Sequence, residues 1–218
     1  METKVIQTPL FVTPDQYFQV EERVEVKLEY ANGKIIPKEG STPLPDWVVR
    51  ELLKPEFDKD ILNFEFPMAT PEHSKIVSQL HGELYFLTRT QNLDLNVYSQ
   101  GIQVMVSLGG KYRIPDVLVS PSSENEQFEK MMLTNPIAIF EVLSDSTADK
   151  DQNEKLEEYL NIESLQEYFL VWQDTMKIER YRRLEGKRWE YAIFREGELP
   201  VSSVDVTLKL DAIYKDVF

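Results

Sequence analysis

The chain has 218 residues, with 24 Lys and Arg against 38 Asp and Glu, so its formal net charge is −14. This negative charge argues against a protein that coats duplex DNA or binds membrane surfaces, because both classes depend on clustered cations. Without cysteine, disulfides, thiolate zinc sites and cysteine nucleophiles are excluded. No apolar run is long enough to span a membrane, and residues 1–10 do not resemble a leader. We therefore expect one acidic, cytoplasmic domain over 1–218.

The N-terminal part predicts a hairpin between two irregular segments. Residues 1–20 show no strong period and are interpreted as an arm. Alternation over 24–30, the Asn32-Gly33 pair and a short apolar run at 34–36 predict a β-hairpin, because Asn-Gly favours tight hairpin turns. Residues 41–69 contain four prolines and are interpreted as an irregular insertion with a short helix at 46–53.

The core is expected over 70–173. Thr70-Pro71-Glu72 predicts a helix start, and apolar residues then recur at helical spacing as far as Leu87. Strands are predicted over 95–106 (one long strand or a bent pair), 113–120, 136–143 and 167–172, with a helix over 150–160. Residues 174–218 add a C-terminal hairpin extension, 176–183 with 188–194, and a strand at 206–210. These elements predict an α/β (α+β) fold with a mixed central sheet flanked by helices.

Two acids interrupt otherwise apolar strands. Glu141 lies within the sequence Pro-Ile-Ala-Ile-Phe-Glu-Val-Leu, and Asp116 opens the apolar stretch of the strand before it. Buried carboxylates need partners, and two that meet repel each other unless a cation lies between them. Mg²⁺ binds through one or two carboxylates together with water and substrate phosphate. We interpret this pair as ligands of Mg²⁺ or Mn²⁺; the alternative for Glu141 is a structural salt bridge, for instance with Arg113.

The helix after Glu141 offers a lysine to the same site. Asp151, Lys155 and Tyr159 recur at four-residue intervals and therefore share one helix face. Lys155 could turn back over the strand ends and orient a water for attack on a phosphodiester. Its alternative is a solvated position among neighbouring glutamates, and Tyr159 is expected to pack rather than to take part in chemistry.

Two further residues are candidates for the rim of the site. His73 lies at the start of the first core helix, near its apolar side, where a histidine also serves for capping or packing. Glu29 stands at a strand end of the predicted hairpin. It is either a further ligand of the metal ion or a residue of the hairpin without a role in the site.

Five segments, in this order, resemble one known family. They are Leu-Glu-Tyr-Ala-Asn-Gly-Lys-Ile-Ile at 28–36; His-Ser at 73–74 with Ile76 and Leu80; Arg-Ile-Pro-Asp-Val at 113–117; Glu-Val-Leu-Ser at 141–144 and Ser-Thr at 146–147, with Asp151, Lys155 and Tyr159; and Glu-Tyr-Phe-Leu-Val at 167–171. From about Glu29 to Val171 the chain resembles a large bacterial family of uncharacterised endonucleases with the PD-(D/E)XK, restriction-endonuclease-like core.

The resemblance implies a metal-dependent endonuclease with DNA as its substrate. Asp116 and Glu141 would hold Mg²⁺ or Mn²⁺, together with the backbone carbonyl of Val142, and Lys155 would orient or deprotonate the attacking water. The general motif places a lysine two residues after the second acid, where this chain has Leu143. The family resembled uses a lysine from the following helix instead. A homodimer is expected if both strands of a duplex are cut.

Two other functions stay open. The first is a catalytically degenerate nuclease fold that acts as a protein-interaction module, which the position of Lys155 and metal binding would separate from an enzyme. The second is an acid-pair hydrolase for another substrate, which predicts a pocket lined by aromatic residues.

One segment carries more positive than negative side chains, although the chain as a whole is negative. Residues 177–195 carry seven Lys and Arg against three Glu, interleaved with Tyr181, Trp189 and Tyr191. A hairpin of this composition suits contact with a nucleic-acid backbone and stacking on bases. A solvated hairpin or a dimer edge explains the same composition.

Overall fold

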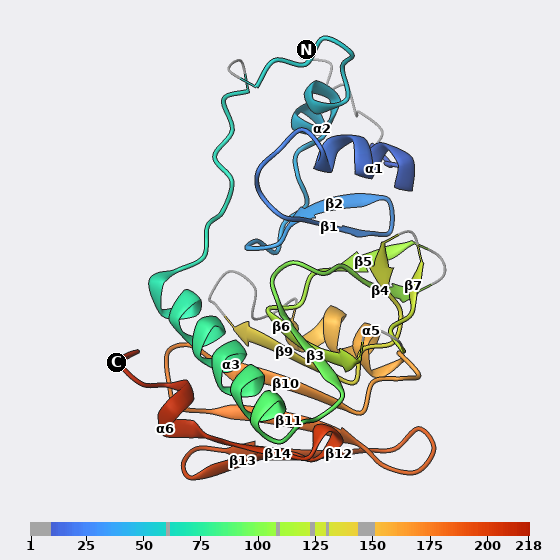
Figure 1. Ribbon diagram of the computed structural model, residues 1–218. Helices are drawn as coiled ribbons and strands as arrows, with labels where there is room; N and C mark the ends of the chain where they lie inside the picture. The colour runs from blue at the N-terminus through green and yellow to red at the C-terminus, as the bar shows by residue number, and fades with distance from the viewer. Residues whose placement is uncertain (1–9, 60–61, 108–109, 123–124, 130, 144–150) are drawn as a thin grey trace.

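A computed structural model describes residues 10–59, 62–107, 110–122, 125–129, 131–143 and 151–218. Its strands form two six-stranded sheets and one two-stranded sheet. Figure 1 shows the first sheet at the top, beside helices α1 and α2, and the second below it, with α3 running across one face. The mixed α+β architecture confirms the predicted fold class.

The first sheet begins with the predicted hairpin. Strands β1 (Leu28–Ala31) and β2 (Lys34–Pro37) pair antiparallel. Both turn residues have positive φ, 52° at Asn32 and 74° at Gly33, as the tightest hairpin turns require. The strand order is β2-β1-β5-β4-β8-β7, where the later strands are β4 (Val104–Ser107), β5 (Lys111–Arg113), β7 (Phe128–Glu129) and β8 (Met132–Leu133).

A helix occupies part of the segment that we interpreted as an arm. Helix α1 (Pro14–Glu21) begins with a capping box, in which the Thr13 side chain accepts from the Gln16 N–H and the Gln16 side chain accepts from the Thr13 N–H. The prediction was wrong for these residues because so short a helix shows little period, whereas its capping signal is local. The predicted short helix is confirmed as α2 (Asp46–Leu52).

The second sheet is mixed, as predicted. Its order is β12-β11-β10-β9-β6-β3, built from β3 (Leu95–Ser99), β6 (Val117–Pro121), β9 (Ala138–Leu143), β10 (Glu167–Trp172), β11 (Ile178–Arg183) and β12 (Trp189–Phe194). Only the β9–β10 pair among these is parallel. The segments predicted over 95–106 and 113–120 each divide between the two sheets, so Asp116 lies at a break just before β6.

Strand β9 is buried on both faces, as its apolar sequence predicted. All six of its residues are buried. Phe140 and Val142 belong to the core cluster that includes Ile76 of helix α3 (Pro71–Thr90). Ile139 and Leu143 pack in the cluster of helix α5 (Leu156–Leu160), on the opposite face. Because side chains alternate along a strand, Glu141 points to the α5 side.

The helix expected over 150–160 changes type along its length. Residues Asp151–Lys155 form a π-helix, η1, and α5 follows directly. Such wider turns are rare and occur often at functional sites. The chain ends with β13 (Glu198–Val201), the 3-10 helix η2 (Ser202–Val204), β14 (Val206–Lys209) and α6 (Leu210–Ile213). Within the described ranges, no helix is long and apolar enough to cross a membrane.

The cap of α3 can be tested directly. The Thr70 hydroxyl oxygen accepts from the His73 N–H at 3.1 Å, and the hydroxyl donates to Gln173 Oε1 at 3.0 Å. We expect Thr70→Ala to lower the free energy of unfolding by about 1 kcal/mol, measured by urea denaturation. Thr70→Ser should keep most of that stability. Thr90→Ala, at the other end of the same helix, is the control. An equal loss of unfolding free energy in Thr90→Ala would show that the cap does not stabilise the helix more than an ordinary helical threonine.

Candidate active site

Asp116 and Glu141 meet where β6 and β9 lie side by side. Val117 pairs with Phe140 in an antiparallel register, which brings Asp116 opposite Glu141. The Val142 N–H donates to Asp116 Oδ2 at 2.7 Å and ties this carboxylate to the neighbouring strand. Both side chains are buried. The two acids singled out in the sequence therefore share one buried location.

Lys155 reaches this location from η1. Its Nζ lies 2.9 Å from Glu141 Oε1, and the residue is 1% exposed, so the solvated alternative does not describe it. The Tyr159 hydroxyl donates to the same Glu141 oxygen at 2.9 Å. Burial and the charge of Glu141 raise the pKa of Tyr159 well above its usual range, which keeps the phenol protonated as a donor. Tyr159 thus contacts the site as well as packing in the core.

A second lysine, which the sequence reasoning missed, lies between the two acids. Lys38 directly follows β2, and its Nζ lies 2.9 Å from Asp116 Oδ1 and 3.4 Å from Glu141 Oε2. It is 4% exposed. Burial opposes its charge, but Asp116 and Glu141 outweigh burial and raise the pKa of Lys38 well above its usual range. A lysine one residue beyond a strand normally indicates the surface, so no sequence signal marked it.

Glu29 is part of the buried site rather than its rim. Its Oε1 lies 3.2 Å from Lys155 Nζ and accepts from the Ile114 N–H at 3.2 Å. Its Oε2 lies 3.2 Å from Arg113 Nη1. Glu29 therefore links the N-terminal hairpin to both Lys155 and Arg113.

His73 contacts Asp116 from the first turn of α3. Its Nε2 lies 3.3 Å from Asp116 Oδ2, and the ring is buried. Burial opposes protonation of His73, but the charge of Asp116 and the hydrogen bond to it outweigh burial and raise the pKa of the ring. Its Nδ1 is buried without a hydrogen-bond partner in the part of the chain that the structure describes. Gln100 adds a longer contact, 3.4 Å from Nε2 to Asp116 Oδ1.

The charges at this location balance. We call the six buried residues that pair here the ion-pair cluster: Glu29, Lys38, Arg113, Asp116, Glu141 and Lys155. It holds three carboxylates and three cations. Burial alone would raise the pKa of Asp116, but Lys38 and His73 hold it well below its usual range. Isolated buried charges cost several kcal/mol each, so each member depends on the others.

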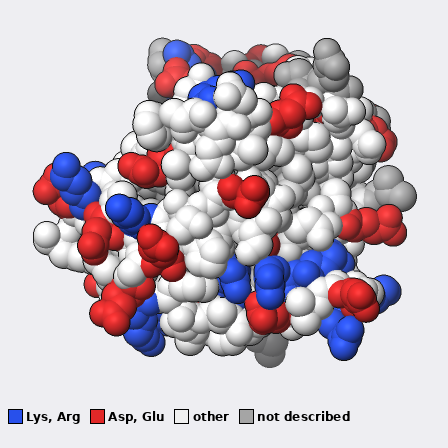
Figure 2. All heavy atoms as spheres, turned by 60° about the horizontal axis from the view of Figure 1, so that its bottom comes forward, with Lys and Arg blue, Asp and Glu red and all other residues white. Residues whose placement is uncertain are grey.

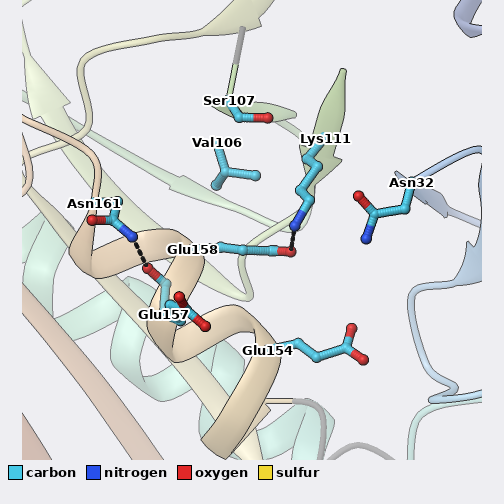
Figure 3. Close-up of a pocket in the computed structure, with 8 residues that line it drawn as sticks. All are labelled: Asn32, Val106, Ser107, Lys111, Glu154, Glu157, Glu158 and Asn161. Atoms are coloured by element: carbon cyan, nitrogen blue, oxygen red, sulfur yellow. Dashed lines mark hydrogen bonds and ion pairs between the residues drawn. The ribbon is translucent and has the colours of Figure 1, made fainter. Parts of the chain in front are cut away.

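Arg113 connects the ion-pair cluster to a cavity on its α5 side. Arg113 Nε donates to Glu158 Oε2 at 2.7 Å, and Lys111 donates to Glu158 Oε1 at 2.8 Å. A cavity of about 390 Å³ lies beside Lys111 and Glu158. Figure 3 shows the residues that line it. Its lining residues are Asn32, Val106, Ser107, Lys111, Glu154, Glu157, Glu158 and Asn161. Three of the eight are glutamates and one is a lysine, so acidic side chains outnumber basic ones in the lining.

Some residues of the predicted constellation cannot be placed. Ser144, Ser146 and Thr147 lie outside the described residues. The backbone of Asp151 lies in η1, but its side chain is not described.

The donor set suits a divalent cation in part. A single ammonium, that of Lys38, touches both Asp116 and Glu141, so one cation can reach both carboxylates. Within the described ranges, no group of three or more His, Cys, Asp or Glu side chains has a metal-binding arrangement. Further ligands would thus come from backbone carbonyls and water, which Mg²⁺ commonly retains. Ligation by the Val142 carbonyl stays a prediction.

Known proteins resemble this chain in sequence. A family model described as "Uma2: Putative restriction endonuclease" matches residues 54–212. Two proteins from Synechocystis sp. PCC 6803 are similar: "Uncharacterized protein sll1609" is 27% identical over 188 residues, 85% of this chain and 88% of its own, and "Uncharacterized protein slr1290" is 23% identical over 205 residues, 94% and 92%.

A solved structure shares the fold. The crystal structure of "a putative nuclease belonging to DUF820" from Anabaena variabilis aligns with a TM-score of 0.62 at 20% identity, over 89% of this chain and 93% of that one. The family match includes Asp116, Glu141 and Lys155, whereas Glu29 and Lys38 precede it. Because the match spans most of the chain, this protein belongs to the Uma2 family, described as putative restriction endonucleases.

Proposed function

We propose that this protein is a metal-dependent endonuclease that hydrolyses phosphodiester bonds of DNA. The observation that carries the proposal is the convergence of Asp116, Glu141 and Lys155 at one buried location, across β6, β9 and η1. Family membership and the nuclease-like fold support it. Burial of three charged side chains at one location is costly, and a catalytic role gives a reason for that cost.

The residues have separable tasks in this reaction. Asp116 and Glu141 would hold Mg²⁺ or Mn²⁺, and a bound divalent ion supplies Lewis-acid stabilisation of the phosphate and a water of lowered pKa. The Val142 N–H keeps the Asp116 carboxylate turned toward Glu141. Lys155, held by Glu141 and Glu29, would donate a hydrogen bond to the attacking water or to a charged phosphate oxygen.

The cavity of Figure 3 does not suit a phosphate backbone. Its lining carries Glu154, Glu157 and Glu158 against Lys111, and like charges repel a polyanion. Among its lining residues, all of them described, none is aromatic. The acid-pair hydrolase with an aromatic pocket thus gains no support from this cavity.

The basic hairpin offers less free charge than its sequence suggested. Arg180 and Arg182 both pair with Glu190, at 3.1 and 2.9 Å, and Lys177 pairs with Glu179 at 2.9 Å. Arg183 donates to the carbonyls of Leu160, Ile162 and Leu165. Figure 2 brings this end of the molecule forward and shows Asp and Glu side chains among the Lys and Arg. Most of its cations are therefore already paired within the fold.

The register also separates the hairpin tip from the site. Glu141 lies level with Leu170 of β10, which lies level with Glu179 of β11. The β11–β12 turn follows Arg183, beyond the end of the sheet where β9 begins. Asp116 and Glu141 lie toward the other end, where β9 stops. We do not assign the tip to substrate contact at this site.

One observation favours a second function. The ion-pair cluster is neutral with Lys38 between the carboxylates, as in a fold that has exchanged metal binding for internal salt bridges. A degenerate nuclease fold that serves as a protein-interaction module would bind no divalent ion. A homodimer remains part of the endonuclease proposal, because two sites would be needed to cut both strands; light scattering of the purified chain tests it.

Cleavage of supercoiled plasmid and single-stranded DNA with Mg²⁺ or Mn²⁺ tests the proposed function. We expect Glu141→Gln to lower the rate at least about 100-fold, because it removes a charge that holds the ion, and Lys155→Met to do the same through loss of a donor. Glu157→Gln, an exposed neighbour on α5, should cleave like the wild type. The proposal fails if the wild type cuts neither substrate or if Glu141→Gln cuts equally well.

The ion pair of Glu158 with Arg113 and Lys111 should make the stability of the protein depend on pH. Burial would raise the pKa of Glu158, but Arg113 and Lys111 outweigh it and lower this pKa. The stability that Glu158 contributes is therefore complete above its unfolded-state pKa of about 4.3 and is lost as the pH falls through the folded-state pKa.

We expect Glu158→Gln to lower the free energy of unfolding at pH 7, and the difference from wild type to shrink below about pH 4.3. Urea titrations at pH 7, 5, 4 and 3.5 measure it. Glu157→Gln serves as the matched control and should show little effect at any of these values. A loss for Glu158→Gln that is constant across the series would contradict the assigned ion pair.

A further inference from the structure

We propose that the Lys38 ammonium is a tethered cation that holds the divalent-ion position between Asp116 and Glu141 and must leave when an ion binds there. This inference rests on the proposed metal-dependent function and adds a residue to it. It makes metal binding at this site a competition between an ion from solution and a side chain of the same protein.

The contacts of Lys38 carry the first step. Its Nζ reaches Asp116 Oδ1 at 2.9 Å and Glu141 Oε2 at 3.4 Å. The remaining oxygens of the two acids face other donors: Asp116 Oδ2 accepts from the Val142 N–H, and Glu141 Oε1 lies against Lys155. The Lys38 ammonium therefore joins one oxygen of Asp116 to one oxygen of Glu141. A divalent ion shared by both acids through these two oxygens would take the place of the ammonium.

The charge balance carries the second step. The six residues of the ion-pair cluster carry three negative and three positive charges, and Glu158 and His73 contact it through Arg113 and Asp116. A divalent ion added beside Lys38 would bring two further positive charges into this buried set, and uncompensated buried charge is strongly unfavourable. Departure of the Lys38 ammonium to solvent removes one positive charge from the set. Coexistence of the lysine and the ion at one pair of oxygens is opposed by like-charge repulsion as well as by space.

The position of Lys38 in the fold carries the third step. Its backbone N–H donates to the Lys27 carbonyl at 2.9 Å, so the hairpin holds the main chain in place. The side chain alone spans from the end of β2 in the first sheet to Glu141 in the second sheet and to Asp116 just before β6. Four rotatable bonds separate the ammonium from this anchor, so it can leave by rotation while the hairpin stays paired.

Two lysine variants test the competition. Lys38→Met keeps an unbranched side chain, one heavy atom shorter, and removes its charge. Lys27→Met removes the same charge from an exposed neighbour in the same hairpin, and so measures the effect of losing a nearby positive charge that does not contact the two acids. Mn²⁺ binding to wild type and to each variant is measured by isothermal titration calorimetry at fixed ionic strength, with circular dichroism to verify folding.

We expect Lys38→Met to bind Mn²⁺ at least tenfold more tightly than wild type, and Lys27→Met to stay within about twofold; tenfold corresponds to about 1.4 kcal/mol. Equal or weaker binding by a folded Lys38→Met overturns the inference but leaves the proposed function intact. Binding by neither protein removes the metal-dependent function as well, and the inference with it.

A second measurement uses the wild type, because Lys38→Met exposes two buried carboxylates to mutual repulsion and can unfold the chain. Acetylation of lysine amines, read by mass spectrometry, reports whether each ammonium is accessible. Without metal, Lys38 should be protected and Lys27 reactive. With Mg²⁺ added, Lys38 should become reactive with a midpoint equal to that of metal binding, while Lys27 stays unchanged. Continued protection of Lys38 at saturating Mg²⁺ would show that lysine and ion coexist, against the proposal.

Discussion

The need to neutralise Glu141 governs the structure around it. This carboxylate lies on a strand whose six residues are all buried, in the middle of a sheet covered on both faces. A carboxylate there is stable only with cations and donors in contact. Lys155 and Tyr159 come from η1 and α5, and Lys38 comes from the hairpin. The helices η1 and α5 and the first sheet are thus all linked to the Glu141 carboxylate.

The N-terminal hairpin completes the site although it lies before the segment that matches the family model. Glu29 and Lys38 supply one anion and one cation, and residues 54–212 alone would leave the cluster without either. The hairpin also fixes Arg113, through Glu29, at the point where the chain crosses from β5 to β6. The two sheets are therefore joined by ion pairs at the proposed catalytic location, and not by apolar packing alone.

The elements and site residues that could be predicted from the sequence are those marked by a few adjacent residues. A lone acid in an apolar strand marks Glu141 by itself, and the hairpin turn and the α3 cap are each set by two or three adjacent residues. Lys155 followed from the resemblance, since its spacing also fits a solvated helix face. Lys38 carried no signal, because its partners lie 78 and 103 residues away and only the folded chain brings them together. Helix α1 had a local signal, its capping box, but its eight residues are too few to show a clear period.

An internal counter-ion gives a physical reason for a lysine in a metal site. If the carboxylates of Asp116 and Glu141 met without a cation, they would repel each other and one would take up a proton. The chain would then gain much of its stability from the ion, as many metal-dependent folds do. With Lys38 between them, the two carboxylates have a counter-ion from the chain itself. The same contact weakens metal binding, because the ion must displace a partner that is already in place. Stability without metal and affinity for metal are therefore opposed at this site, and the length and flexibility of one side chain set the balance between them.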